Sequence, residues 1–231
     1  MVRYEHIFFD LDRTLWDFDR NSREALLEMI AAHSLRERGV EDTDSFISSY
    51  QKINEHYWAL YRQQEITKAV LRTIRFADTL RLFGVDDEKL AASLADDYIA
   101  ISPRKTQLLP GAIELLDHLA AHYRLHIITN GFEEVQHIKL QHSGLQPYFE
   151  EVITSERAGT KKPGPAIFHL ACTLSGARIE TSLMVGDDLE TDIRGARGVG
   201  MDQAYLNVNK YEHGEEVTHE VHRLDELKGV L

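Results

Sequence analysis

Two aspartates separated by one residue follow an apolar, aromatic run near the start of the chain. The stretch FFDLDRTL, residues 8–15, places Asp10 and Asp12 at the end of a segment with the pattern of a buried strand. Like charges held together at such a position repel each other unless a cation neutralises them. Because carboxylates suit Mg²⁺, which takes a few protein ligands and keeps several waters, this pair predicts a magnesium site.

Polar residues that could bind a metal ion or a phosphate follow three further strand-like segments. They are Thr129, Asn130 and Gly131 after the second segment, Lys161 and Lys162 in the loop after the third, and Asp187 and Asp188 after the fourth. In open parallel sheets, ligands bind beyond the carboxyl ends of the strands, so we expect these four ends to converge. A threonine hydroxyl, backbone amides and a lysine would bind phosphate oxygens beside the metal, which predicts phosphoryl transfer.

The segments that must position these residues alternate between strand and helix patterns. Strands are expected at residues 4–10, 124–130, 150–155, 181–188 and 202–207, and helices at residues 110–121, 133–143, 163–174 and 190–198. This alternation predicts the α/β class, as a doubly wound, mainly parallel sheet with helices on both faces.

About ninety residues after the first strand break the alternation and carry helical periodicity instead, which is far longer than an ordinary connection. The helices expected there span residues 21–38, 43–62, 67–83 and 86–101. We therefore expect an α/β core domain made of residues 1–15 and 106–231, and an inserted all-helical cap domain made of residues 16–105.

Composition limits the class of protein. A chain of 231 residues with 43% hydrophobic content can bury a substantial core, and its net charge of -12 disfavours binding to a nucleic-acid polymer. The single cysteine, Cys172, excludes an intrachain disulfide, and we expect neither a secretory leader nor a membrane span. These features predict a cytoplasmic protein. We expect a monomer or a homodimer, and the strand-end residues indicate a small phosphorylated metabolite as its partner.

The strand-end residues resemble the four signature motifs of the haloacid dehalogenase superfamily, most of whose members are Mg²⁺-dependent phosphatases. The motifs, in order, are DLDRT at residues 10–14, HIITNG with Thr129 at its strand end, the Lys-Pro step in KKPGPAIF, and GDDLETD at residues 186–192. Four motifs in this order, each at a strand end, make the resemblance specific. It covers most of the chain and implies the same core fold with a helical cap.

The resemblance also implies a role for each matched residue. Asp10 would be the nucleophile that forms an aspartyl-phosphate, and Asp12 the general acid and base. Thr129, with the amides of Asn130 and Gly131, would bind phosphoryl oxygens, and Lys162, directly before a proline, would shield the charge.

The same resemblance implies a set of Mg²⁺ ligands. They would be the Asp10 side chain, the Asp12 backbone carbonyl and the Asp187 carboxylate, while Asp188 or Asp192 would orient the bound waters. Which of Asp187 and Asp188 binds the metal directly stays open.

Asp12 separates reaction classes within the superfamily. Dehalogenases and phosphonate-cleaving members have no carboxyl at this position because their leaving groups need no acid, so Asp12 favours a phosphatase over a 2-haloacid dehalogenase. A mutase keeps this aspartate and stays possible. Arg13 departs from the Gly, Asn or Glu more common at that position, which leaves the local loop structure open.

The insertion resembles the first class of superfamily caps, which usually select small phosphoesters. The stretches LWDFDRNS, ITKAVLRTIRF and GDDLETDIRGAR are similar to the branch that holds pyrimidine 5'-nucleotidases and N-acylneuraminate-9-phosphatases. We therefore expect a pyrimidine nucleoside 5'-monophosphate as substrate. The alternatives are a sugar phosphate, sialic acid 9-phosphate, or a non-catalytic module that binds a phosphometabolite. The candidates for contacting a base are Trp16, Phe18, Trp58, Tyr61 and Arg72.

Overall fold

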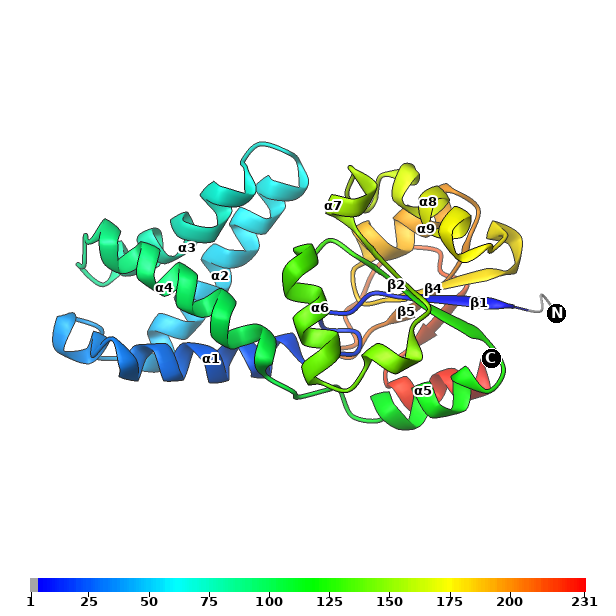
Figure 1. The fold of residues 1–231 in the computed structure, drawn as a ribbon, viewed down its shortest axis with the longest axis horizontal. Helices are drawn as coiled ribbons and strands as arrows, with labels where there is room; N and C mark the ends of the chain where they lie inside the picture. Colours follow the sequence, from blue (N-terminus) through cyan, green and yellow to red (C-terminus); the bar gives the residue numbers. More distant parts are fainter. Residues whose placement is uncertain (1–3) are drawn as a thin grey trace. The chain divides into compact units, whose positions relative to one another are not determined.

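The computed structural model describes residues 4–231, which divide into two compact units (Figure 1). One unit contains residues 4–18 and 106–231, and the other contains residues 19–105. The second unit begins at Asp19 and not at Trp16, because Trp16 and Phe18 pack against the apolar core of the first unit.

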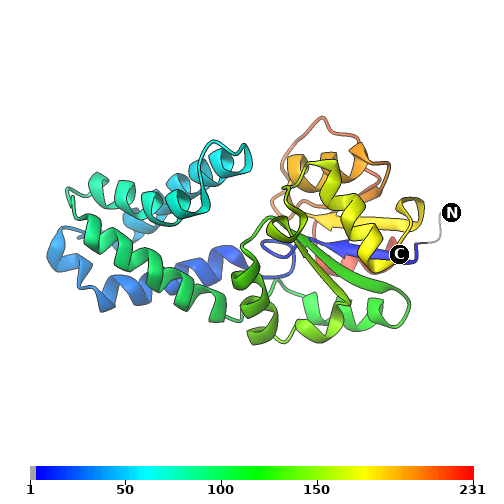
Figure 2. The same ribbon diagram turned by 45° about the horizontal axis from the view of Figure 1, so that its top comes forward.

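The first unit is built on a six-stranded sheet in which every pairing is parallel (Figure 2). Its strands lie in the order β3-β2-β1-β4-β5-β6. Their bounds are β1 (His6–Phe9), β2 (Arg124–Thr129), β3 (Glu151–Thr154), β4 (Ser182–Gly186), β5 (Asp202–Leu206) and β6 (His219–Val221). The predicted doubly wound parallel sheet is confirmed. Because β1 lies between β2 and β4, the strand ends that carry three of the predicted motifs are neighbours.

The edge strand β6 is absent from the sequence prediction. It pairs with β5 over three residues, from Ala204 opposite His219 to Leu206 opposite Val221. A strand of this length is too short to show a period-two pattern, so the sequence does not reveal it.

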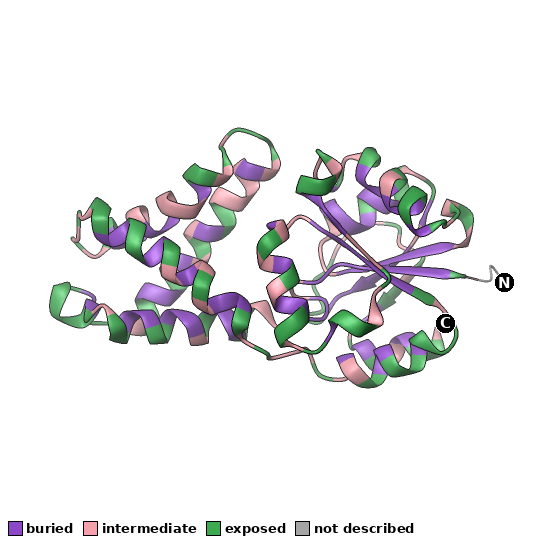
Figure 3. Ribbon diagram, in the orientation of Figure 1, coloured by how far each residue is buried: buried purple, intermediate pink, exposed green. Residues whose placement is uncertain are grey.

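Helices cover both faces of the sheet, whose strands are largely buried (Figure 3). The helical segments of this unit are α5 (Ala112–Ala120), α6 (Glu133–His142), η3 (Gln146–Tyr148), α7 (Ser155–Ala158), α8 (Pro165–Ser175), η4 (Ile179–Thr181), η5 (Leu189–Arg194), α9 (Gly195–Gly198) and η6 (Leu224–Gly229). α5, α6 and η6 pack on the face to which β1 contributes Ile7 and Phe9, and α8 and α9 pack on the face to which it contributes Phe8. Successive strand residues point to opposite faces, so both faces of β1 are apolar and its polar residues lie at its ends.

The second unit is all-helical, as predicted. Its segments are α1 (Phe18–Ala32), η1 (Leu35–Arg38), α2 (Thr43–Arg62), α3 (Lys68–Leu82), α4 (Glu88–Ile101) and η2 (Ser102–Arg104). The predicted helix over residues 21–38 is wrong at its C-terminal end, because Ser34 adopts a left-handed conformation with φ of 49° and interrupts it. Among residues 4–231, no helix is long and apolar enough to cross a bilayer.

Candidate active site

A buried lysine joins two of the predicted motifs at the carboxyl end of the sheet. Lys162 Nζ lies 2.7 Å from Asp10 Oδ1 and 2.6 Å from Asp192 Oδ1, and it donates to the Ile128 carbonyl at 2.7 Å. An ammonium group has three protons, and these contacts use all of them. Lys162 is only 2% exposed. Burial alone would lower the pKa of Lys162, but the two carboxylates outweigh it and hold the pKa above its usual value. Lys162 is therefore a fixed positive charge between Asp10 and Asp192.

The Asn130 side chain fixes the backbone of this lysine. Asn130 Nδ2 donates to the Lys162 carbonyl at 3.0 Å, and the Lys162 N–H donates to Asn130 Oδ1 at 2.8 Å. This two-way pair ties the loop after β2 to the loop before α8. Asn130 thus holds the lysine in place.

Three carboxylates gather beside the lysine. Asp10, Asp187 and Asp192 each offer an oxygen, and these oxygens lie within 4.8 Å of one another. Burial raises the pKa of Asp10 to about 7 although Lys162 opposes the rise, and burial, reinforced by Asp10, raises the pKa of Asp187. Burial raises the pKa of Asp192 as well. Desolvated carboxylates at this spacing favour a bound cation, and an all-oxygen set fits Mg²⁺.

Asp187 and Asp188 face different groups. Asp187 Oδ1 accepts a hydrogen bond from Thr14 Oγ1 at 3.0 Å, which holds Asp187 beside the DLDRT stretch. Asp188 instead caps η5, because its Oδ1 accepts from the N–H groups of Glu190 and Thr191, both at 2.9 Å. The geometry therefore favours Asp187 over Asp188 as a direct ligand.

Residues 190–198 do not form the single helix predicted from the sequence. They begin within the π-helical segment η5, and α9 follows. Asp192, on η5, points back to the end of β4, where its Oδ2 would lie 2.2 Å from a Cβ atom at Gly186. A side chain at position 186 would therefore push Asp192 away from Lys162. The wider turn fits a pattern in which π-helical turns occur at functional sites.

Asp12 contacts a different set of side chains from those that contact Asp10. Lys139 Nζ lies 2.5 Å from Asp12 Oδ1, and Gln136 Nε2 donates to Asp12 Oδ2 at 2.9 Å. The same Gln136 nitrogen donates to Thr129 Oγ1 at 2.6 Å, and the Gly131 N–H donates to that hydroxyl at 3.1 Å. Asp12 is therefore linked to Thr129, and its side chain keeps 27% of its surface exposed.

Gln136 and Lys139 are functional candidates that the sequence prediction missed. Both lie on α6, where the expectation for polar residues is a solvated helix face. The available signal was their spacing of three residues beside Leu140 in EEVQHIKL, which places all three on one side of the helix.

Arg13, which directly follows Asp12, has an unusual backbone conformation. Its φ is +62°, in the left-handed region that glycine and asparagine tolerate best. The Arg13 guanidinium lies 4.7 Å from the centre of the Phe18 ring, a cation–π contact that offsets part of this strain.

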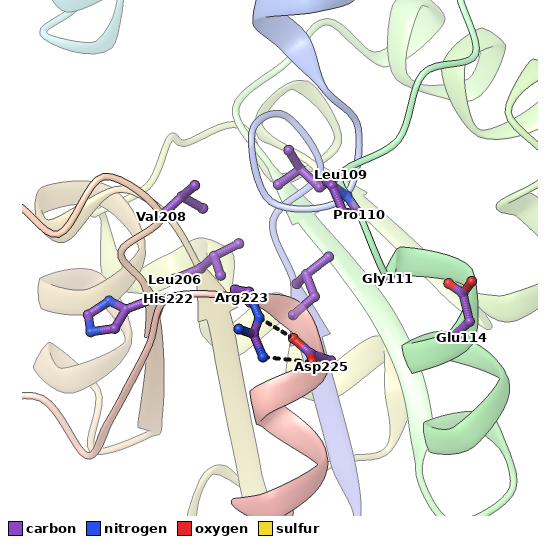
Figure 4. Close-up of a pocket in the computed structure, with 10 residues that line it drawn as sticks. Leu109, Pro110, Gly111, Glu114, Leu206, Val208, His222, Arg223 and Asp225 are labelled. Atoms are coloured by element: carbon purple, nitrogen blue, oxygen red, sulfur yellow. Dashed lines mark hydrogen bonds and ion pairs between the residues drawn. The ribbon is translucent and has the colours of Figure 1, made fainter.

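A separate cavity of about 540 Å³ lies between the start of α5, the end of β5 and η6 (Figure 4). Its lining is mostly apolar, including Leu109, Leu206 and Val208, and the Arg223–Asp225 ion pair lies at its margin with contacts of 2.9 Å. None of the clustered acids or Lys162 lines it, so the predicted chemistry does not belong to this cavity.

Two of the residues predicted to contact a base, Trp16 and Tyr61, are buried. Trp16 is fully buried in the core of the first unit, where it packs near Phe18 and Lys139. Tyr61 is 7% exposed and meets Trp58 edge to face. The burial of Trp16 indicates a packing role.

Known proteins resemble this chain along most of its length. The haloacid dehalogenase-like hydrolase family matches residues 4–200. The chain is 34% identical to pyrimidine 5'-nucleotidase PynA of Streptococcus pneumoniae, with 99% of this chain and 95% of that protein covered. It is 30% identical to human N-acylneuraminate-9-phosphatase, with 91% and 84% covered.

A solved structure also resembles the whole chain. The crystal structure of the putative HAD-hydrolase YfnB from Bacillus subtilis, bound to magnesium, has a TM-score of 0.88 and 28% identity, and 99% of this chain and 98% of that chain are covered. A family match over residues 4–200, together with a similar fold and a full-length relative above 30% identity, establishes the family. This chain is a hydrolase that belongs to the haloacid dehalogenase-like family.

Proposed function

We propose that this protein is a Mg²⁺-dependent phosphatase that hydrolyses pyrimidine nucleoside 5'-monophosphates through an aspartyl-phosphate intermediate. The observation that carries the proposal is the division of labour between the two aspartates of DLDRT. Asp10 is buried against Lys162, whereas Asp12 is partly exposed and is linked to Thr129 through Gln136. A nucleophile and a separate proton donor are what a phosphatase of this type requires.

In the first step, an Asp10 oxygen attacks phosphorus and the bond from phosphorus to the ester oxygen breaks. Lys162 binds Oδ1 of Asp10 at 2.7 Å, which leaves Oδ2 for the attack. Asp12 gives its proton to the departing ester oxygen, so the nucleoside leaves as a neutral alcohol.

In the second step, a water molecule attacks the phosphorus of the aspartyl-phosphate. Asp12, now a carboxylate, takes a proton from this water, and the acyl-phosphate bond breaks to return the Asp10 carboxylate and inorganic phosphate. Lys162 balances the negative charge of Asp10 and of the transferring group in both steps.

Thr129 is suited to bind a phosphoryl oxygen. Its oxygen accepts bonds from Gln136 Nε2 and the Gly131 N–H, which occupy both lone pairs. The hydroxyl proton is therefore directed elsewhere, and an anionic oxygen beside Asp12 would accept it.

Asp10 and Asp187, together with the Asp12 backbone carbonyl, would hold the metal ion. Bound Mg²⁺ would neutralise the phosphoryl oxygens and orient them for attack. Asp192 has a partner at each oxygen, because Oδ1 pairs with Lys162 at 2.6 Å and Oδ2 accepts from the Asp188 N–H at 3.2 Å. We therefore assign Asp192 to positioning the lysine and the ligand waters.

The substrate assignment is supported by the 34% identity with a pyrimidine 5'-nucleotidase across nearly the full length of both chains. A second candidate is sialic acid 9-phosphate, which the 30% identity with an N-acylneuraminate-9-phosphatase supports. Both are phosphomonoesters of a primary alcohol, so the same core chemistry serves either.

Phosphate release from a panel of nucleotides, sugar phosphates and sialic acid 9-phosphate, each with Mg²⁺ or with EDTA, tests the proposal. We expect pyrimidine 5'-monophosphates to rank first, EDTA to stop turnover, and Asp10→Asn to lower the rate by more than about 1,000-fold. A near-normal rate in Asp10→Asn would refute the nucleophile assignment. Preference for the sialic acid ester would replace the substrate but keep the mechanism.

A further inference from the structure

Helix α6 buries polar side chains where packing alone would favour apolar ones. The buried residues within this helix are Gln136, Lys139 and Leu140, of which Gln136 is 0% and Lys139 is 5% exposed. Lysine is rarely buried unless it is paired, and a leucine or methionine would serve helix–sheet packing better. A specific role for these two side chains would account for this composition.

Both polar side chains point to the same target. Lys139 Nζ lies 2.5 Å from Asp12 Oδ1, and Gln136 Nε2 lies 2.9 Å from Asp12 Oδ2, so each oxygen of the carboxylate has its own donor. A carboxylate held at both oxygens cannot rotate freely about its χ angles. The Asp12 rotamer is therefore set from α6 and not only by its own loop.

The lysine also contacts two aromatic rings. Its Nζ lies 4.3 Å from the centre of the Trp16 ring and 5.9 Å from that of Phe18. These are cation–π distances, and the aromatic rings restrict the long lysine side chain to one path. Trp16 and Phe18 thus act on Asp12 through Lys139.

Gln136 has a second contact that fixes a distance within the site. Its amide nitrogen binds Asp12 at 2.9 Å and Thr129 Oγ1 at 2.6 Å. A side chain at Gly131 would place its Cβ 2.3 Å from Gln136 Nε2, so the glycine of the TNG stretch leaves room for this amide. Gln136 Oε1 is buried without a hydrogen-bond partner among the described residues, which indicates that the amide orientation serves the nitrogen's two acceptors.

We propose that Gln136 and Lys139 are positioning residues that hold the Asp12 carboxyl group at a fixed place beside Thr129. Each Asp12 oxygen uses one lone pair for its donor, and the other lone pair of one oxygen carries the proton that goes to the leaving oxygen. This inference rests on the proposed phosphatase function and extends it to α6. A displacement of about 1 Å at a reacting group can lower a rate about 100-fold, so a clamp of this kind has a measurable effect.

The test uses two esters that differ in how much they need the proton. From a pyrimidine nucleoside 5'-monophosphate, the nucleoside departs as an alkoxide unless its ester oxygen is protonated. From p-nitrophenyl phosphate, the leaving group is a stable phenolate that needs no proton. For each ester, kcat/KM reports on the steps up to leaving-group departure, provided that this departure is irreversible. Full-length Lys139→Met, which keeps the apolar stem, is compared with Lys139→Arg, which keeps the charge.

We expect Lys139→Met to lower kcat/KM for the nucleotide by about 100-fold and for p-nitrophenyl phosphate by less than about threefold. Lys139→Arg should restore part of the nucleotide rate. Gln136→Met should show the same split if the amide acts on Asp12, and it provides a second variant if Lys139→Met does not fold, as judged by thermal unfolding. Lys228→Met, an exposed lysine on η6, is the matched control and should change neither ester.

Equal losses for the two esters, or no loss for either in folded variants, would overturn the clamp and leave the phosphatase assignment in place. Wild-type protein that cleaves neither ester would instead overturn the proposed function, and the clamp with it. The wild-type measurement therefore separates the two failures.

Discussion

At the carboxyl ends of β1 and β4 the sheet buries carboxylates and Lys162, which carry opposite charges and pair at 2.6 to 2.7 Å. Near the amino-terminal ends of β1 and β2 it buries two imidazoles, with His6 Nδ1 and His126 Nε2 3.0 Å apart and the rings stacked. The first arrangement is an ion-pair cluster, so it requires an ionised lysine and ionised carboxylates. The second is compatible with neutral groups, since one imidazole N–H can donate to the other ring's bare nitrogen.

The two ends therefore respond to opposite perturbations. The carboxyl end is sensitive to the removal of positive charge, because Asp10 and Asp192 are paired with the Lys162 ammonium group. The amino-terminal end is sensitive to the addition of positive charge, because burial and the neighbouring imidazole lower the pKa of His126 to about 4. This contrast separates a buried ion-pair cluster from a buried pair of uncharged polar groups.

The largest effect on the free energy of unfolding is expected from removing the Lys162 ammonium group at the carboxyl end of the sheet. Lys162→Met leaves Asp10 and Asp192 buried without their ion-pair partner, and breaking a buried pair in this way costs about 3 to 5 kcal/mol. Urea unfolding in EDTA measures this loss. Lys161→Met, at the partly exposed neighbouring position, should change the free energy of unfolding by less than about 0.5 kcal/mol. Equal effects for the two lysines would contradict the ion-pair network.

At the amino-terminal end, acid should destabilise the protein through His126. Its pKa is about 4 in the folded chain and 6.5 in the reference state, so the unfolded chain binds the extra proton between these values. Stability from this group is complete above about pH 6.5 and is lost as the pH falls toward 4, by about 3 kcal/mol. His6 also has a lowered pKa, from burial, and the nearby Arg124 and Glu150 are paired with each other at 2.8 Å.

His126→Phe should flatten this part of the pH dependence, because the ring is kept and the proton-binding group is removed. The measurement is urea unfolding of wild type and variant at pH 7 and at pH 4. His118→Phe, at an exposed position on α5, is the matched control and should retain the wild-type slope. An unchanged slope in His126→Phe would show that the imidazole pair does not control stability in acid.

Mg²⁺ should stabilise the carboxyl end and leave the amino-terminal end unaffected. A ligand that binds only the folded state stabilises it by about 2.7 kcal/mol at 100 times its dissociation constant. Thermal unfolding with increasing Mg²⁺ should therefore show a rising Tm in wild type and in His126→Phe alike. Asp187→Asn removes a carboxylate from the cluster and should reduce the rise. A full rise in Asp187→Asn would remove this residue from the ligand set.

The sequence predicted one end of the sheet much better than the other. Asp10, Thr129 and Asp187 were singled out because polar residues interrupt apolar strand patterns at their carboxyl ends, where a parallel sheet collects them. Lys162 was singled out in the loop after the third strand, because it directly precedes a proline. The histidine pair was not found, because contact between His6 and His126 depends on the register of β1 against β2, which places Phe8 opposite His126.

Helical residues of the site were hidden for a related reason. Gln136 and Lys139 are buried because the rest of the first unit packs against their side of α6. The sequence of a short helix does not show which of its polar residues will be buried. Likewise, GDDLETD gave the acids but not their directions, because a π-helical turn replaces the regular helix there. Positions along the chain were predictable, whereas side-chain directions required the fold.

Asp188 offers the smallest and most local test of that distinction. Its carboxylate accepts two backbone N–H groups at the start of η5, and removal of such a cap costs about 1 kcal/mol. Asp188→Ala should therefore lower the free energy of unfolding by about this amount, and Asp188→Ser, which retains an oxygen acceptor, should recover most of it. Urea unfolding of the three proteins measures the effect, and Mg²⁺-induced stabilisation should stay at the wild-type level in both variants. If the serine variant lost Mg²⁺ binding while its stability recovered, Asp188 would belong with the metal site and the geometric preference for Asp187 would need revision.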